Sequence, residues 1–204
     1  MDGAGPEQQL LDSPGIDIQR NPYDWSSDGR FILYAILNTN NEDLWVFDTS
    51  TSREYPLIQG PLNKSQGQFS PDGKWIAYTL DESGKVEVYT REFLPPEKLA
   101  DHRTKISLDG GSEPRWRQDG KELFYLGPDG AMMALGIEAG SIVHAAKPVK
   151  LFPAKGKPDG FGWPSTIKFA VAANGQKFIM VVEAKPASVS PINVLLNPLF
   201  QPPK

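Results

Sequence analysis

Residues that could carry out chemistry are sparse in this chain of 204 residues. The sequence has no cysteine, which excludes disulfides, zinc–thiolate sites and thiol nucleophiles. Imidazole is available only from His102 and His144, and neither stands in a nucleophile–base pattern. No Gly-x-Ser-x-Gly elbow occurs either. A binding function is therefore favoured over catalysis, and a hydrolase whose site is assembled from distant residues is the alternative.

Two segments concentrate the oxygen atoms that hard cations prefer. Residues 38–43, NTNNED, contain Asn41 and Asp43, and residues 80–85, LDESGK, contain Asp81. Carboxylate and amide oxygens bind calcium, but neither segment has the regular spacing of an EF-hand loop. The two hypotheses are a calcium site that uses Asn41, Asp43 and Asp81, or a pair of solvated turns between strands.

A repeated hairpin must position these residues. The segment FSPDGKWIAY at 69–78 has relatives in DWSSDGRFILY at 24–34, RWRQDGKELFY at 115–125 and AVAANGQKFIM at 170–180. Their Asp-Gly or Asn-Gly pairs begin at residues 28, 72, 119 and 174, about 44, 47 and 55 positions apart, near the ~40–50 residues of a propeller blade. Glycine supplies the positive φ of a tight hairpin, and Asp or Asn tolerates the left-handed region. The sequence therefore specifies each turn.

The repeat predicts an all-β fold, a β-propeller of about four four-stranded antiparallel blades in a single domain, 1–204. The predicted blades cover 22–60, 67–109, 113–153 and 165–200, and the last of them has only three strands. We expect a strand at Glu7–Leu11 to complete it by pairing with Ile192–Leu196, within one chain or between neighbours. If four blades do not close, the exposed flanks favour a homodimer through the blade edges.

The repeat register also selects candidate ligand-binding residues, because propellers bind ligands where the innermost strands converge at the mouth of the channel. The first residues of the four copies are Asp24, Gln68, Arg115 and Ala170, and Glu113 lies near the third. Strand alternation turns them away from the apolar residue that follows each one. They form either a site for a polar ligand or cation, or ion pairs that join the blades.

The longest interruption of the repeat, 154–165, places two aromatic residues in a loop rich in Gly and Pro. Phe161 and Trp163 could cap one mouth of the ring and stack on an apolar or cyclic ligand. The alternative is that they fill the core of a small ring. We therefore predict that Phe161 and Trp163 contact the ligand, together with Asp24, Gln68, Glu113 and Arg115.

Charge and hydropathy exclude other classes of partner. The net charge of −4 disfavours broad contact with nucleic acid phosphates or anionic lipid. No apolar run approaches the ~20 residues that span a bilayer, and the acidic start of the chain lacks the apolar segment of a secretory signal. We expect a soluble module with a protein or small-molecule ligand, no bound nucleic acid and no membrane insertion.

The Pro71-Asp72-Gly73 turn resembles the signature of TolB-like, PD40-type (WD40-like) propeller repeats. The resemblance to these repeats covers nearly the whole chain. The segments that begin at Ser112 and Asn174 are similar to the C-terminal propeller of bacterial transmembrane Ser/Thr protein kinases, which implies a sensory or interaction domain outside the membrane. Kinase activity is not implied, because the sequence lacks a Gly-rich phosphate loop and a His-Arg-Asp loop. Analogy with propeller lactonases defines the enzymatic alternative, a calcium-dependent hydrolase of small esters or lactones.

Overall fold

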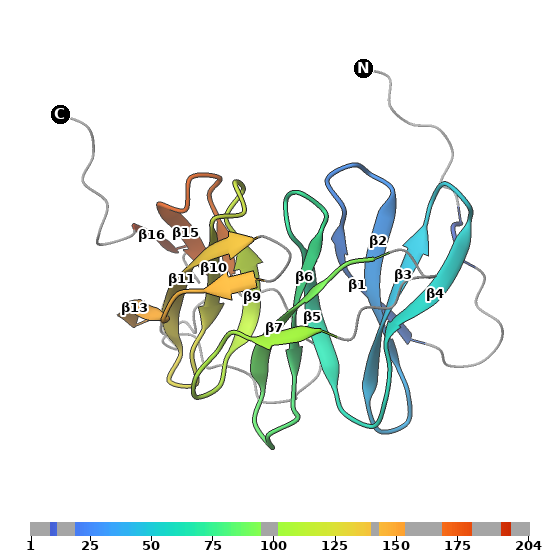
Figure 1. The fold of residues 1–204 in the computed structure, drawn as a ribbon, viewed down its shortest axis with the longest axis horizontal. Coiled ribbons are helices and arrows are strands. Elements are labelled where there is room, and N and C mark those ends of the chain that lie inside the picture. Colours follow the sequence, from blue (N-terminus) through green and yellow to red (C-terminus); the bar gives the residue numbers. More distant parts are fainter. Residues whose placement is uncertain are drawn as a thin grey trace, which may run out of the picture.

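The computed structural model describes residues 9–11, 19–94, 102–139, 143–153, 169–180 and 193–196. These residues form strands and no helix, which confirms the predicted all-β fold class. The strands make four antiparallel sheets in chain order, and we call these sheets the first to fourth blades. Figure 1 shows them side by side in a row, with the first and fourth at opposite ends. Within this part of the chain, no helix has the length and apolarity to cross a membrane.

The first two blades each have four strands in sequential order. The first contains β1 (Gln19–Trp25), β2 (Phe31–Leu37), β3 (Glu42–Asp48) and β4 (Arg53–Ile58). The second contains β5 (Lys64–Phe69), β6 (Trp75–Leu80), β7 (Glu87–Glu92) and β8 (Arg103–Lys105). Each strand pairs with its sequence neighbour, as expected for a blade that runs from the inside of a propeller outward.

The third and fourth blades depart from this pattern. The third contains β9 (Ser112–Trp116), β10 (Glu122–Leu126), β11 (Ala131–Ala139), β12 (Val143–Ala145) and β13 (Val149–Pro153). Because β11 is nine residues long, its first part pairs with β13 and its last part with β12. The fourth blade contains β14 (Phe169–Val171), β15 (Lys177–Met180) and β16 (Asn193–Leu196), so its described part has three strands.

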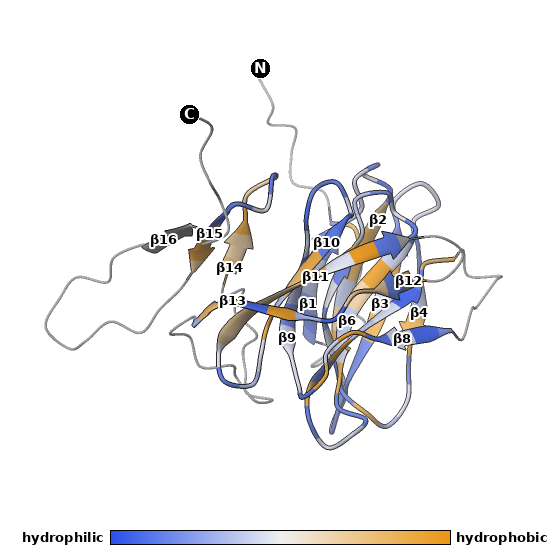
Figure 2. Ribbon diagram, turned by 60° about the vertical axis from the view of Figure 1, so that its left-hand side comes forward, coloured by the Kyte–Doolittle hydropathy of each residue, from blue (hydrophilic) through white to orange (hydrophobic). Residues whose placement is uncertain are grey.

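Apolar residues lie between the sheets, because the inner strands carry apolar side chains on both faces. On β6, Ile76 and Tyr78 contact the cluster shared with the first blade, while Trp75 and Ala77 contact the cluster shared with the third. All six residues of β6 are buried. Figure 2 shows hydrophobic residues along β2, β14 and β15. Face-to-face packing of consecutive sheets is thus the main stabilising contact between blades.

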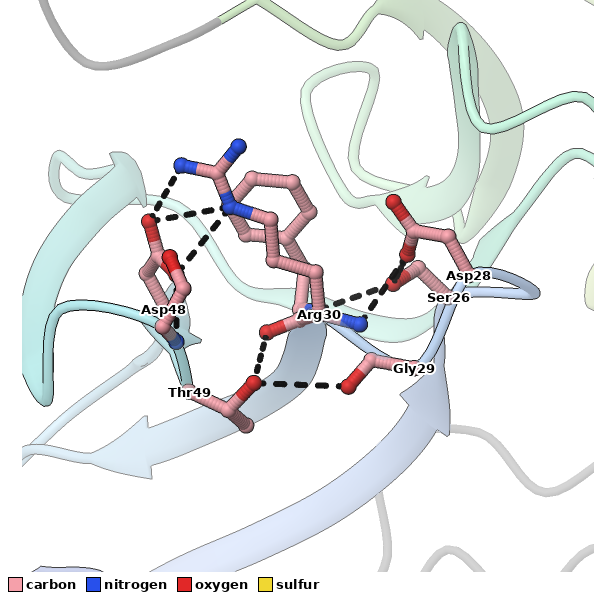
Figure 3. Close-up of polar contacts among 8 residues, drawn as sticks. Ser26, Asp28, Gly29, Arg30, Asp48 and Thr49 are labelled. Atoms are coloured by element: carbon pink, nitrogen blue, oxygen red, sulfur yellow. Dashed lines mark hydrogen bonds and ion pairs between the residues drawn. The ribbon is translucent and has the colours of Figure 1, made fainter.

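The hairpin turn of the first blade differs from the prediction in the role of its Asp. Gly29 has a φ of 74°, but Asp28 is not in the left-handed region. The backbone N–H of Gly29 donates to the carbonyl of Ser26 at 2.8 Å. Asp28 Oδ1 accepts from the N–H of Arg30 at 3.0 Å (Figure 3). The Asp is therefore selected as a side-chain acceptor within the turn, because it bonds the backbone two residues on.

The same acceptor recurs in every blade. Asp72 accepts from Lys74 N–H at 3.2 Å and Asp119 from Lys121 N–H at 3.0 Å, and the Asn174 amide oxygen accepts from Gln176 N–H at 3.1 Å. In the first two blades a serine hydroxyl also bonds the carboxylate at 2.6 Å, from Ser26 to Asp28 and from Ser70 to Asp72. The hydrogen bond from Ser26 and the N–H of Arg30 lower the pKa of Asp28.

The predicted N-terminal strand is not formed in its described part. Gln9–Leu11 are not in a strand, and the side chain of Leu10 is 43% exposed. Glu7 and Gln8 lie outside the described residues. The partner of β16 is β15. The four blades therefore form an open row, and their closure stays a prediction.

Candidate functional site

The inner strands β1, β5 and β9 lie next to one another and bring the predicted channel residues together. Asp24 Oδ2 accepts a hydrogen bond from the backbone N–H of Phe69 at 2.8 Å. One blade later, Gln68 Oε1 accepts from the backbone N–H of Trp116 at 2.9 Å. Asp24 and Gln68 occupy equivalent positions, so each side chain holds the backbone of the next blade. The sequence alternative joined the blades by ion pairs, whereas these bonds join them through backbone N–H groups.

Arg115 occupies the third equivalent position but has only donors. Its Nη2 lies 3.1 Å from Glu113 Oε2, and its Nη1 donates to the Pro114 carbonyl at 2.7 Å. The guanidinium lies 5.6 Å from the ring centroid of Phe169 in the fourth blade. The third and fourth blades are therefore joined by a cation–π contact at the position where the earlier blades use an acceptor.

Burial governs the electrostatics of this cluster. Burial raises the pKa of Asp24, while the N–H groups of Phe69 and Trp25 and the positive charge of Arg115 oppose that rise. Burial also lowers the pKa of Arg115, and the negative charges of Glu113 and Asp24 oppose this. A guanidinium nevertheless stays charged at any physiological pH. The cluster is thus a partly neutralised group of charges held between blades.

Gln66 belongs to the same cluster and was missed from the sequence. Its Oε1 accepts from the backbone N–H of Glu113 at 2.8 Å, and its Nε2 donates to Glu113 Oε1 at 3.3 Å. Gln66 and Glu113 stand at equivalent positions of β5 and β9, and both have a positive φ, 55° and 56°. A left-handed conformation is unusual for a residue with a side chain. Their equivalent place in the repeat, two residues before Gln68 and Arg115, was the signal that could have identified the pair.

The candidate calcium ligands lie where protein donors already bond them. Lys64 Nζ lies 2.8 Å from Asp43 Oδ1, and both side chains are nearly inaccessible to solvent. Asn41 Nδ2 also donates to Asp43 Oδ1, at 3.2 Å. Asp81 accepts from both the backbone and the side chain of Asn63, each at 2.9 Å. Among the described residues, no group of three or more His, Asp or Glu is arranged to hold a metal ion.

The remaining predicted residues do not join the cluster. His102 and His144 are exposed, in the second and third blades. Phe161 and Trp163 lie outside the described residues.

A cleft of about 400 Å³ lies between the hairpin turns of the second and third blades. The indoles of Trp75 and Trp116, both mostly buried, contribute to its apolar wall. Its other lining residues come from the two turns and from β11: Ser70, Asp72, Asp119, Gly120, Lys121, Ile137 and Glu138. The lining thus combines three carboxylates with one ammonium group. The sequence did not indicate this cleft, because a cleft between blades leaves no local motif.

The three carboxylates of this cleft differ in their partners. Arg117, whose Nε lies 2.7 Å from Asp119 Oδ1, lowers the pKa of Asp119 to about 2. Asp72 accepts from the hydroxyl of Ser70 at 2.6 Å, and its nearest ammonium, Lys74 Nζ, is 4.0 Å away. Glu138 is exposed at the edge of the cleft. Because Arg117 pairs with Asp119 and Lys74 lies near Asp72, Glu138 is the cleft carboxylate best placed to attract a cation.

Comparison with known proteins agrees with this architecture. The chain is 26% identical over 138 residues to the Tol-Pal system protein TolB of Wolinella succinogenes, across 66% of this chain and 31% of that protein. TolB from Acinetobacter baumannii superposes with a TM-score of 0.63 at 17% identity, over 88% of this chain and 41% of that chain. A puromycin-hydrolyzing peptidase of Mycobacterium tuberculosis gives a TM-score of 0.57 at 14% identity, over 80% and 28%. No protein-family model matches the chain.

The chain has a TolB-like β-propeller fold. The resemblance predicted from the Pro71-Asp72-Gly73 repeat is thus confirmed. The chain spans less than half the length of either TolB protein. Because a peptidase shares the TolB-like fold, the fold does not by itself decide between binding and catalysis.

Proposed function

We propose that the chain is a non-catalytic β-propeller binding module, and that it holds a basic side chain of a partner protein in the cleft between its second and third blades. The observation that carries this proposal is that Trp75 and Trp116 line one cleft together with three carboxylates. A cation next to an indole ring gains about 0.5–2 kcal/mol. Carboxylates around it add charge complementarity and select against anionic ligands.

The size and charge of the cleft favour a single arginine side chain. A volume of about 400 Å³ is near the lower end of the ~300–1,000 Å³ that small-ligand pockets occupy. Asp72, Asp119 and Glu138 line the cleft with Lys121, and Arg117 pairs with Asp119, so the exposed carboxylate of Glu138 is the charge that a cationic ligand would meet. A guanidinium stacks on aromatic rings and bonds carboxylates through two N–H groups, whereas an ammonium does neither as well. An arginine that projects from a partner's loop therefore matches the cleft.

The channel residues support this choice of site. Asp24 and Gln68 each use a side-chain oxygen to accept from the backbone of the next blade, and Arg115 is paired with Glu113. A polar ligand at Asp24, Gln68, Glu113 and Arg115, with Phe161 and Trp163 above it, would have to compete with those bonds. The cleft carboxylate of Glu138 is exposed and requires no such exchange.

The resemblance to TolB-like propellers and to those of bacterial transmembrane kinases supports an extracytoplasmic setting for this module. In such a setting a propeller would recognise another protein on the same side of the membrane.

Titration with two matched peptides tests the proposed function. The probes are acetyl-Gly-Arg-Gly-amide and the same peptide with citrulline, which keeps the shape of arginine and removes its charge. We expect chemical-shift changes at the indole N–H signals of Trp75 and Trp116, and at least about ten-fold tighter binding of the arginine peptide. Equal affinity for both peptides, or shift changes confined to other residues, would overturn the proposal.

A matched pair of variants locates the binding. Glu138→Gln removes a charge at the cleft and should weaken the arginine peptide several-fold, because one of three carboxylates is lost. Asp109→Asn removes the same charge from another exposed position, outside the cleft lining, and should leave affinity unchanged. If Asp109→Asn weakens binding as much as Glu138→Gln, the attraction is a general effect of net charge and the cleft is not the site.

A further inference from the structure

We call the face of each blade that points toward the next blade in the chain its forward face, and the opposite face its rear face. The forward face of the fourth blade exposes an apolar residue at a position that is buried in the other blades. Leu33, Ala77, Phe124 and Ile179 occupy the same position, five residues after the Asp or Asn of each hairpin turn. The first three are 0%, 0% and 1% exposed, because the next blade covers them. Ile179 is 51% exposed. Its face of β15 therefore has the composition of a blade-to-blade contact, and no further blade among the described residues covers it.

The rear face of the first blade shows the complementary feature. Phe69 and Trp116 pack against the preceding blade and are 4% and 7% exposed. Trp25, at the same position of β1, is 56% exposed. Beside it, Ile32 is partly exposed, whereas its equivalent Ile76 is 0% exposed. Arg20 and Glu54, 3.5 Å apart, are the charged groups on this side, where Glu54 accepts from the hydroxyl of Tyr34.

The exposed forward face of the fourth blade and the exposed rear face of the first blade are the two surfaces that pack together at each junction between blades. Within the row, the rear face of each blade packs on the forward face of the blade before it: Phe69 shares a cluster with Leu33, and Trp116 shares one with Ala77. Trp25 and Ile179 would meet in the same way, but Figure 1 places their blades at opposite ends of the row. One chain therefore cannot cover both residues with its own described blades.

We propose that a second copy of this chain covers both faces, with the Trp25 face of each copy packed on the Ile179 face of the other. Each of these contacts is head-to-tail, and the two together form a closed two-fold dimer when the rotation between blades sums to a full turn. Two rows of four blades would make an eight-bladed ring, which lies within the ~4–8 blades that propellers use. This inference does not depend on the cleft between the second and third blades.

Sedimentation velocity over a range of concentrations tests the proposal. We expect a reversible species with twice the mass of the chain. Ile179→Glu and Trp25→Arg should each weaken it at least about ten-fold, because a charge would be placed in an apolar contact. Leu108→Glu is the matched control, since Leu108 is 58% exposed in the second blade and lies on neither face. Circular dichroism verifies that each variant stays folded.

Mixing the two variants separates this arrangement from others. A mixed dimer of Trp25→Arg and Ile179→Glu chains has one unaltered contact and one that pairs Arg with Glu, so mixing should restore the dimer. A dimer that Ile179→Glu does not weaken would show a rear-to-rear contact and overturn the proposal. A chain that stays monomeric to about 1 mM, or one that forms species larger than a dimer, would also overturn it.

Discussion

The carboxylate of Asp24 in the first blade accepts a hydrogen bond from the backbone N–H of Phe69 in the second blade at 2.8 Å. Gln68 repeats this relationship one blade later, with the N–H of Trp116 at 2.9 Å. The sheets are separate, so main-chain pairing does not align one inner strand with the next. These side-chain acceptors supply that alignment at equivalent positions of the repeat.

Removing an acceptor should destabilise the junction between two blades. Asp24→Ala leaves the N–H of Phe69 without its partner, and we expect a loss of about 1–3 kcal/mol in the free energy of unfolding, measured in urea. Asp24→Asn keeps an acceptor oxygen and should cost less. Asp109→Ala, at an exposed position, is the control. A loss from Asp24→Ala no larger than from Asp109→Ala would contradict the structural role.

The raised pKa of Asp24 predicts a pH dependence. Burial is its main cause, so the folded protein binds a proton at Asp24 more readily than the unfolded chain does. This contribution to stability is fully present below the unfolded pKa, near 3.8, and is lost as the pH rises through the folded pKa. Asp24→Asn should therefore show a smaller loss of unfolding free energy above about pH 4 than the native chain. Identical pH profiles would argue against burial as the dominant effect.

Two glycines with the same backbone conformation should differ in their tolerance of a side chain. Gly73 has a φ of 68° and no atom within 4 Å of an added Cβ, so Gly73→Ala should cost only backbone strain, about 1–2 kcal/mol. Gly175 has a φ of 72°, but an added Cβ would lie 2.9 Å from Arg117 Cδ and 3.1 Å from Phe124 Cζ. Gly175→Ala should cost about 1–3 kcal/mol more, from overpacking. If the two variants unfold at the same urea concentration, the side chains of Arg117 and Phe124 move aside without measurable cost.

The buried pair of Lys64 and Asp43 should behave as a unit. Lys64→Met removes the ammonium that lies 2.8 Å from Asp43 and leaves a buried carboxylate, which should cost about 3–5 kcal/mol of unfolding free energy. The double variant Lys64→Met/Asp43→Asn removes both charges and should be more stable than Lys64→Met. If the double variant is the less stable of the two, the two side chains are not coupled as this distance indicates.

Calcium provides the test between the binding module and the alternative hydrolase. Because Lys64 bonds Asp43, and Asn63 bonds Asp81, we expect calcium or EDTA to move the thermal midpoint of the native chain by less than about 1 °C. We also expect no turnover of simple esters and lactones. Calcium-dependent turnover that EDTA abolishes would instead support the hydrolase, with Asn41, Asp43 and Asp81 as the ligands to substitute first.

Local features of the sequence were sufficient for the repeat. The Asp-Gly and Asn-Gly pairs, the apolar residue before each turn and the apolar strand after it predicted the blades, because turn chemistry and strand alternation act over a few residues. The same register grouped Asp24, Gln68 and Arg115 with Glu113. It misjudged the Asp of the turn, since a local pattern does not distinguish a left-handed backbone from a side chain that accepts a hydrogen bond.

Which face of each blade is covered, and where a cleft opens between blades, depends on how the blades pack against one another. Trp25, Phe69 and Trp116 are equivalent in sequence, yet only Trp25 is largely exposed, because exposure depends on the neighbouring blade. The cleft beside Trp75 and Trp116 likewise arises from the separation of two turns, which no single turn encodes. Turn chemistry and strand alternation in the sequence are sufficient for one blade and its repetition, whereas the packing between blades produces the cleft and the two exposed faces.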